Sequence, residues 1–206
     1  MLIILSDFMS LDGVVQAPGA EDEDTDGGFA HGGWSMPLFD PEVMGPVIDE
    51  GLASTEALLF GRRTWAIMAA HWPEQAGDPF AERMNTIPKY VASRTLSADE
   101  AASRWSNTTL LGGAGEDAIP AIRSLRASGG DGRLLVMGSS SLARQLVEND
   151  LVDEYMLMIE PIILGGGKTI FPTDGRARSL ELTSVKQAKT GVLVCTYRPA
   201  EPPATA

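Results

Sequence analysis

The sequence predicts an α/β fold: a mainly parallel central sheet, helices on both of its faces, and an antiparallel hairpin at its C-terminal edge. Three short apolar runs, at residues 2–8, 57–60 and 134–137, indicate strands that are buried on both sides. Stretches with the apolar spacing of helices follow these runs, and this alternation is typical of parallel sheets covered by helices. The 206 residues suit one domain, which we place at residues 1–198, before a flexible tail at 199–206.

A long loop and three helices are expected in the first half of the chain. Residues 16–40 are rich in Gly, Pro, Asp and Glu and lack helical periodicity, so we expect an acidic loop that acts as a lid. Asp40 is placed as the N-cap of the next helix, with a proline at the first helical position. The strand at 57–60 turns through Gly61 into a second helix, and a third helical stretch lies near 79–84.

Four further strands and two helices are expected in the second half, from apolar runs and helical spacing. The strands are expected at residues 89–92, 153–163, 180–189 and 192–198, and the helices at 117–127 and from the serines at 139–141 to about 148. A short turn near Gly191 joins the last two strands, which predicts the hairpin at the sheet edge.

The charge balance and the soft ligands exclude several classes of function. With 28 acidic and 16 basic residues the net charge is −12, so neither nucleic acid nor an anionic membrane is expected as a partner. The one cysteine, Cys195, cannot form an internal disulfide, and no signal peptide or membrane span is recognisable, so a cytoplasmic location is expected. His31, His71 and Cys195 lie at no zinc-like spacing, and the acidic run at 22–26 lacks the closing glutamate of a calcium loop. No metal is expected.

Three of the predicted strands end in residues suited to phosphate. They are followed by Gly61, Arg62, Arg63 and Thr64, by Ser93, Arg94 and Thr95, and by Gly138, Ser139, Ser140 and Ser141. Ligands of open α/β sheets bind beyond the carboxyl ends of the strands, and helix N-termini there attract anions. Charge-assisted hydrogen bonds from arginine add roughly 1.5–3 kcal/mol each. A single junction of this kind is explained by a helix N-cap alone, but three together favour a ligand with several phosphates, such as a dinucleotide with an extra ribose phosphate.

Other ligand-binding and catalytic motifs are missing. No G-x-G-x-x-G follows the first strand, and no G-x-S-x-G occurs. Residues 165–169 resemble the end of a phosphate-binding P-loop, but Ile162 stands where the first glycine is required. An ordinary Rossmann site, ATP binding by this loop and nucleophilic hydrolysis are therefore not supported.

Several motifs resemble those of a known family. Residues 58–65, Leu-Leu-Phe-Gly-Arg-Arg-Thr-Trp, resemble the Gly-Arg-x-Thr-Trp/Tyr cofactor motif of dihydrofolate reductases. Residues 10–13, Ser-Leu-Asp-Gly, are similar to the opening of the reductase domain at the C-terminus of bifunctional riboflavin deaminase-reductases. The segments at 136–142, 151–155, 161–165 and 171–172 follow that domain in the same order. The resemblance covers roughly residues 1–198 and implies the dihydrofolate-reductase-like fold.

The resemblance implies NADPH as the cofactor and assigns residues to it. Residues 61–64 would hold the cofactor phosphates. Ser93 and Arg94 would lie beside the adenosine ribose and its 2′-phosphate, which favours NADPH over NADH. The turn at residues 138–140 would cradle the pyrophosphate, where dihydrofolate reductases usually have a Gly-Gly pair.

The same resemblance suggests residues on the substrate side. Trp34-x-x-Pro37-x-x-Asp40 is similar, with one extra residue, to the stretch that carries the proton-delivering carboxylate in bacterial dihydrofolate reductases. It implies Asp40 as a catalytic acid, Asp12 as a catalytic group that orients the substrate near the nicotinamide, and Trp34 as a wall of the substrate pocket. Glu160 would add a polar contact to the substrate. Helix capping by Asp40 and core packing by Trp34 remain alternatives.

Together these residues predict hydride transfer from NADPH to a small conjugated heterocycle that is pterin-like or pyrimidine-like. The family resemblance also implies a homodimer through the C-terminal edge strands. The alternative is a non-catalytic dimer on the same fold that binds a nucleotide or a flavin-like ligand. The ribosylamino-pyrimidine of riboflavin synthesis is a possible acceptor, but no deaminase domain and no clear extra basic residues for a substrate phosphate accompany the motifs.

Overall fold

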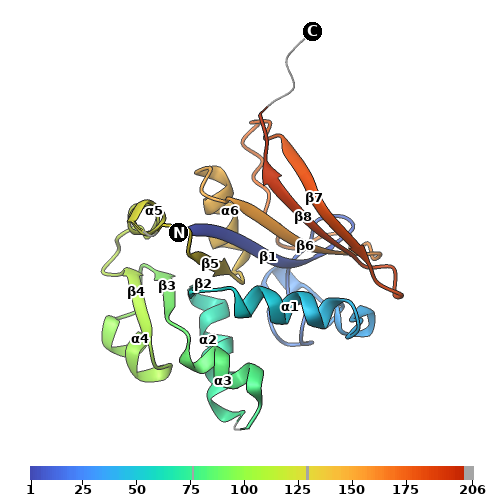
Figure 1. The fold of residues 1–206 in the computed structure, drawn as a ribbon. Helices are drawn as coiled ribbons and strands as arrows, with labels where there is room; N and C mark the ends of the chain where they lie inside the picture. The colour runs from blue at the N-terminus through green and yellow to red at the C-terminus, as the bar shows by residue number, and fades with distance from the viewer. Residues whose placement is uncertain (76, 129, 202–206) are drawn as a thin grey trace.

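A computed structural model describes residues 1–75, 77–128 and 130–201, and it confirms the α/β fold with a mainly parallel sheet. In this part of the chain the strands are β1 (Leu2–Ser10), β2 (Ala57–Gly61), β3 (Lys89–Ser93), β4 (Thr108–Gly112), β5 (Arg133–Val136), β6 (Glu154–Glu160), β7 (Leu180–Gln187) and β8 (Leu193–Pro199). They form one sheet in the order β4-β3-β2-β5-β1-β6-β8-β7 (Figure 1). Strands β1 to β6 are parallel, so their carboxyl ends meet at one edge.

The predicted antiparallel hairpin is also confirmed. Strand β8 runs antiparallel to β6 on one side and to β7 on the other, so β7 forms the outer edge of the sheet. The predicted strand at 153–163 ends earlier, at Glu160, where the backbone turns at Pro161 and the Ile162 amide donates to the Glu160 carbonyl. Strand β1 is longer than predicted and includes Ser10.

Helices cover both faces of the sheet, as the sequence predicts. They are α1 (Met44–Ala53), α2 (Arg62–His71), α3 (Pro79–Thr86), α4 (Ala98–Arg104), α5 (Ile119–Ser128) and α6 (Ser140–Glu148). Helices α1 to α4 lie on one face and α5 and α6 on the other (Figure 1). Because side chains alternate along a strand, Leu58 and Phe60 pack toward the first group of helices and Leu59 toward the second.

Two elements were not predicted, helix α4 and strand β4. The signal for α4 is a capping pattern: the Ser97 hydroxyl accepts a hydrogen bond from the Glu100 amide, three residues later. Strand β4 carries two threonines and lies at the edge of the sheet, so it lacks the wholly apolar run that marks the inner strands.

The prediction that Asp40 caps the next helix is wrong. Helix α1 begins at Met44, and the preceding residues form a turn. The Asp40 carboxylate instead accepts hydrogen bonds from the amides of Glu42 (2.9 Å) and Lys189 (2.9 Å). Asp40 therefore joins the start of α1 to the turn between β7 and β8.

The predicted lid, residues 16–40, folds back onto the domain through two short 3₁₀ turns, Asp26–Gly28 and Met36–Leu38. Within this lid, the side chains of Trp34 and Ser35 are buried. In the predicted tail, Pro199 still belongs to β8, and residues 202–206 lie outside the described residues. Among the described helices, none has both the length and the apolar character that a bilayer-spanning segment needs.

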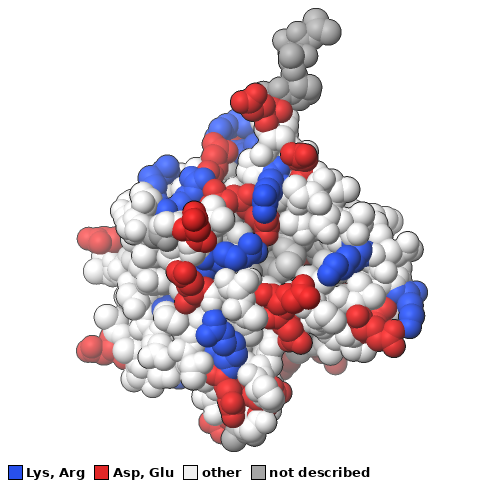
Figure 2. Space-filling model, in the orientation of Figure 1, with Lys and Arg blue, Asp and Glu red and all other residues white. Residues whose placement is uncertain are grey.

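The net charge of −12 does not form one acidic surface. Figure 2 shows basic side chains between acidic ones on the face seen in Figure 1. Ion pairs join some of these charges, for example Arg126 with Asp153 (2.5 Å) and Arg198 with Glu154 (2.8 Å). Any cleft for an anion must therefore be recognised from local charges.

Candidate functional site

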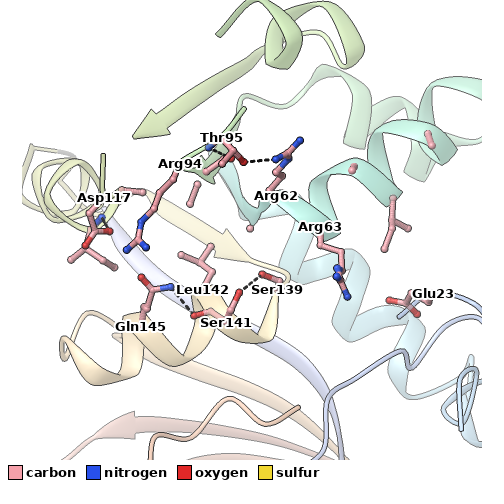
Figure 3. Close-up of a pocket in the computed structure, with 18 residues that line it drawn as sticks. Glu23, Arg62, Arg63, Arg94, Thr95, Asp117, Ser139, Ser141, Leu142 and Gln145 are labelled. Carbon is pink, nitrogen blue, oxygen red and sulfur yellow. Dashed lines mark hydrogen bonds between the residues drawn. The ribbon is translucent and has the colours of Figure 1, made fainter. Parts of the chain in front are cut away.

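A cavity of about 880 Å³ lies at the carboxyl ends of β2 and β3, beside the N-termini of α2, α5 and α6 (Figure 3). Six of the residues predicted to bind the cofactor line it: Gly61, Arg62, Arg63, Ser93, Arg94 and Ser139. The structure thus brings the three predicted strand ends together in one cleft, as expected for the edge of a parallel sheet.

A close backbone contact forms the centre of this cleft. The Gly61 amide donates a hydrogen bond to the Gly138 carbonyl (3.1 Å). A Cβ atom on Gly61 would lie only 3.1 Å from the Ser139 Cβ and 3.2 Å from the Ser139 amide nitrogen, and it would overlap the hydroxyl. Gly138 has a φ of +85°, which favours glycine. Both glycines are therefore required for the turns after β2 and β5 to meet.

Two helix N-termini open onto the cleft. Helix α2 begins at Arg62 and α6 at Ser140, and in the described structure neither receives a side-chain cap from its N-cap residue, Gly61 or Ser139. Amides in the first turn of each helix can therefore donate to a ligand, and the two helix dipoles favour an anion. This combination is typical of phosphate sites.

The three arginines of the cleft point in different directions (Figure 3). Arg62 donates a hydrogen bond to the Thr95 hydroxyl, and Arg94 extends between Asp117 and Gln145. Within the described residues, neither Arg62 nor Arg94 forms an ion pair. Both guanidinium groups therefore keep their charge available to a bound anion.

Arg63 points away from the other two arginines, toward the lid. Its guanidinium pairs with the carboxylates of Asp24 and Asp26 (2.6 Å to the latter). Lys168 reaches the same two carboxylates at 2.5 and 2.8 Å. Hydrogen bonds from Arg63 and then from Lys168 lower the pKa of Asp26 to about 2, so this carboxylate stays ionised at neutral pH.

The remaining three residues predicted to bind the cofactor lie behind the cleft wall. A Cβ atom on Gly138 would lie 3.1 Å from the Thr64 hydroxyl, so Thr64 backs the turn. Ser140 is the first residue of α6. These residues shape the turn that faces the cleft.

The side chains of the four residues predicted on the substrate side form hydrogen bonds with other residues of the protein. The Trp34 side chain is 7% exposed and its indole N–H donates to the Gln16 carbonyl (2.8 Å). Glu160 is fully buried and accepts a hydrogen bond from the Ser35 hydroxyl at 2.5 Å. Burial raises the pKa of Glu160 to about 7, against the opposing effect of that hydroxyl. The Ser35–Glu160 hydrogen bond joins the lid to β6, whereas the Trp34–Gln16 bond lies within the lid.

Asp12 and Asp40 do not line the cleft. The Asp12 carboxylate accepts hydrogen bonds from the Ser10 hydroxyl (2.7 Å) and from the amides of Leu164 and Gly165, which lower its pKa to about 2. The Lys189 amide is the main cause that lowers the pKa of Asp40. A proton donor at neutral pH needs a raised pKa, so these bonds do not favour either carboxylate as the catalytic acid. Their catalytic roles stay predictions.

Asp7, on the central strand β1, is a carboxyl that sequence reasoning missed. Its Oδ2 atom is buried and, in the described structure, has no hydrogen-bond partner. Burial, and then the negative charge of Glu23, raise the pKa of Asp7 to about 8, so the side chain is neutral at pH 7. Ser6 and Phe8 beside it are also partly exposed, although β1 lies inside the sheet. The only sequence signal is an acidic residue within an apolar strand.

Thr95 and Ser141 also line the cleft, as members of the predicted strand-end motifs, although neither was assigned to the cofactor. Four further lining residues were missed: Glu23, Asp117, Leu142 and Gln145. Gln145 lies one helical turn after Ser141 and donates to its carbonyl (3.0 Å), a spacing that sequence alone could have suggested. Glu23 had no such signal, because it reaches the cleft only when the lid folds back. Among the described residues, no cluster of three or more His, Cys, Asp or Glu side chains could hold a metal ion.

Comparison with known proteins gives one family and a set of relatives. A family model described as the RibD C-terminal domain matches residues 1–194. The chain is 24% identical over 200 residues to YyaP of Bacillus subtilis (strain 168), which is described as an uncharacterized protein. The matched region covers 95% of this chain and 93% of that protein.

Solved structures share the fold at low identity. A proposed riboflavin biosynthesis protein of Shewanella sp. PV-4 has a TM-score of 0.71 and 19% identity, with 98% of this chain and all (100%) of that chain covered. A pyrimidine reductase-like protein of Corynebacterium diphtheriae has a TM-score of 0.63 and 13% identity, with 98% and 92% covered. RibD of Acinetobacter baumannii has a TM-score of 0.64 and 14% identity, with 97% of this chain but 58% of that chain covered. At these identities the likeness shows the fold.

Proposed function

The chain belongs to the RibD C-terminal domain family, and on that premise we propose that it is an NADPH-dependent reductase of a small conjugated heterocycle. The observation that carries the proposal is the cleft in which three strand ends, two helix N-termini and two arginines converge, neither arginine forming an ion pair within the described residues. Family membership supports a reductase. The cofactor and the acceptor are the proposed part.

The cleft fits a dinucleotide with an extra phosphate. The backbone contact at Gly61 leaves no room for a side chain, and phosphate sites need this close approach to backbone amides. The first turns of α2 and α6 would hold the pyrophosphate. Ser93, Arg94 and Arg62 would hold the 2′-phosphate, because these arginines have no carboxylate partner in the described residues. NADPH, when bound, would supply the hydride for the acceptor ring.

The chain's own contribution is to position the two reactants and to exclude water. The lid lies beside the cleft at Glu23 and Arg63, where it would cover the acceptor. Asp7 and Glu160 are two buried carboxyls near β1 whose raised pKa values let them donate hydrogen bonds at neutral pH. A flat pterin-like or pyrimidine-like ring offers the nitrogen and oxygen acceptors that such donors suit.

One observation favours the alternative, a non-catalytic dimer that binds a nucleotide or a flavin-like ligand. The two carboxylates predicted to be catalytic, Asp12 and Asp40, are occupied by backbone amides. Such a protein would bind NADPH or a related nucleotide without turnover. The cytoplasmic location expected from the sequence stays a prediction.

The test is hydride transfer itself. Purified protein with NADPH is mixed with a pterin-like acceptor and, separately, with a ribosylamino-pyrimidine, and the loss of reduced-nicotinamide absorbance is followed. Oxidation that depends on one acceptor, and that falls in Arg62→Ala, supports the reductase. Tight NADPH binding with no oxidation by any acceptor favours the non-catalytic alternative. No NADPH binding contradicts both the cofactor and the reductase.

We also propose that the protein is a homodimer that pairs through β7. Every residue of this edge strand is exposed, including the apolar Leu182 and Val185. An exposed edge strand with apolar side chains is a surface that soluble proteins usually cover. Light scattering should give a dimer mass for the wild type and a monomer mass for Leu182→Asp. A monomeric wild type would contradict the proposal.

A further inference from the structure

We propose that Arg63 is a positioning residue that locks the lid closed, and that it is not a ligand of the cofactor phosphates. The proposal rests on the proposed reductase function and assigns Arg63 a role opposite to that of its neighbour Arg62. We call Arg63, Lys168, Asp24 and Asp26 the latch.

The latch joins three segments that are far apart in the sequence. Asp24 and Asp26 belong to the lid, Arg63 to the first turn of α2, and Lys168 to the glycine-rich segment after β6. Each cation contacts both carboxylates, so four ion pairs form among four residues. The Asp24 side chain is only 12% exposed, which places part of the latch out of water.

The lid backbone is fixed in position to meet these cations. The Gln16 side-chain amide donates to the carbonyls of Asp24 (3.0 Å) and Asp26 (3.0 Å) and accepts from the Lys168 amide (3.1 Å). The Asp24 carboxylate also accepts from the Asp26 amide (3.2 Å). The two carboxylates are therefore held in place before any ligand arrives.

The two positive and two negative charges of the latch balance, so the latch has no unpaired positive charge to offer a phosphate. Two cations face two carboxylates, and Glu23 adds a further carboxylate to the cleft wall near Arg63. A phosphate that bound Arg63 would have to displace carboxylates and approach Glu23. Arg62 and Arg94 present no such obstacle, since neither has a carboxylate partner in the part of the chain that is described.

Closing the lid has a consequence at the sheet. With the lid down, Trp34 is buried and the Ser35 hydroxyl reaches Glu160. The latch would thus hold the far side of the same loop that shields the acceptor end of the cleft from water. The Arg63 side chain is 45% exposed, so salt should weaken the latch.

The test compares the two neighbouring arginines with one lid carboxylate. Arg63→Ala, Asp24→Asn, their double variant and Arg62→Ala are each checked for folding by thermal unfolding. Hydrogen exchange of the lid amides is then measured without cofactor. We expect exchange to rise about threefold to fivefold in Arg63→Ala and in Asp24→Asn, and to rise in the double variant by less than the product of the two single effects, because the two residues share one ion pair. Arg62→Ala should leave lid exchange unchanged, and Arg63→Lys should restore part of the protection.

The NADPH dissociation constant separates the latch from the phosphate-ligand role. The latch predicts that it stays within about threefold of wild type in Arg63→Ala and Asp24→Asn, while kcat falls because the open lid admits water. A phosphate ligand at Arg63 predicts the opposite pattern. Arg63→Ala would then weaken NADPH binding more than tenfold, and Asp24→Asn would strengthen it by releasing the guanidinium. That pattern, or unchanged lid exchange in Arg63→Ala, would overturn the proposal.

Failure of the proposed function gives a different result. If the wild-type protein binds no NADPH, the reductase proposal falls, whereas lid exchange in the cofactor-free protein still decides whether Arg63 holds the lid.

Discussion

The two ends of the cleft use the same kind of residue in different ways. At the open end, Arg62 donates to the Thr95 hydroxyl and Arg94 extends between Asp117 and Gln145, and neither guanidinium forms an ion pair within the described residues. At the lid end, Arg63 follows Arg62 directly in the sequence but is paired with Asp24 and Asp26. A basic residue beside a helix N-terminus therefore indicates a phosphate site only when no carboxylate of the same chain has already paired with it.

The acidic groups differ between the two ends as well. On β1 and β6, burial of the carboxyl groups raises the pKa of Asp7 to about 8 and that of Glu160 to about 7, so Asp7 is mostly neutral and Glu160 partly neutral at pH 7. Asp24 and Asp26 of the lid instead have cationic partners, and the pKa of Asp26 is lowered to about 2. The open end thus presents unpaired positive charge within the described residues, whereas the lid end has buried carboxyl groups and internal ion pairs.

The largest effect is expected from Gly61→Ala, which would disrupt the contact between Gly61 and Ser139 at the open end of the cleft. The new methyl group would meet both the side chain and the amide nitrogen of Ser139. Overpacking of this kind costs about 1–3 kcal/mol, so the free energy of unfolding should fall by that amount and NADPH binding should be lost. Chemical denaturation and cofactor titration measure the two changes.

The matched control is Gly45→Ala in α1, where a Cβ atom meets nothing within 4 Å. This variant should keep NADPH binding, and no gain in the free energy of unfolding is expected, because Pro46 follows directly and disfavours a helical residue with a Cβ. Equal NADPH affinity in Gly45→Ala and Gly61→Ala would contradict the claim that NADPH binding needs the contact between the turns after β2 and β5.

The second-largest effect is expected from Arg94→Ala, as a loss of the preference for NADPH over NADH. Arg94→Ala removes a cation expected to contact the 2′-phosphate, so the dissociation constant for NADPH should rise about tenfold. Binding of NADH, which lacks that phosphate, should change less than twofold. Titrations of both nucleotides give the two constants; an equal loss for both would place Arg94 elsewhere along the cofactor.

A third effect concerns Asp7 and pH. The folded-state pKa is about 8 against 3.8 for an ordinary aspartate, so the folded protein binds one more proton than the unfolded chain between these values. Its free energy of unfolding therefore falls as pH rises from about 4 to 8. Asp7→Asn cannot ionise, so relative to wild type it should gain more than about 1 kcal/mol between pH 5 and 8.

Chemical denaturation of both proteins at several pH values measures this difference. Glu160 remains in both proteins, so its own titration cancels in the comparison. Parallel stability curves for wild type and Asp7→Asn would show that Asp7 ionises normally.

The smallest effect is expected from Ser35→Ala at the lid end. It removes the hydroxyl that donates to buried Glu160. At pH 6, below the Glu160 pKa, the carboxyl is mostly neutral, so the cost should be about 0.5–1.5 kcal/mol of unfolding free energy. Lid exchange should rise slightly and NADPH binding should not change. A large loss of NADPH binding would mean that the two ends of the cleft are coupled.

The fold and the open end could be predicted because their signals are local. Short, mainly apolar runs mark β1, β2 and β5, and the residues that directly follow β2 and β3 are among those that line the cleft. Strand β4 was not predicted, because it lies at the sheet edge and has two threonines in place of a wholly apolar run.

The lid end could not be predicted, because its contacts join distant residues. Asp24 is 39 positions from Arg63 and 144 from Lys168, and no periodicity signals such pairs. Asp40 was assigned to a helix cap by its local pattern, but its carboxylate meets Lys189, 149 positions away. Asp7 shows no motif at all, and only its burial in the sheet reveals it.

The most direct test of the central claim is titration of wild type and Arg62→Ala with NADPH and with NADH, followed by fluorescence. If the open end of the cleft binds the cofactor phosphates, the wild type should bind NADPH more tightly than NADH, and Arg62→Ala should lose about tenfold in NADPH affinity. Binding of neither nucleotide by the wild type, or equal binding of both that survives Arg62→Ala, would contradict the assignment of this cleft to NADPH.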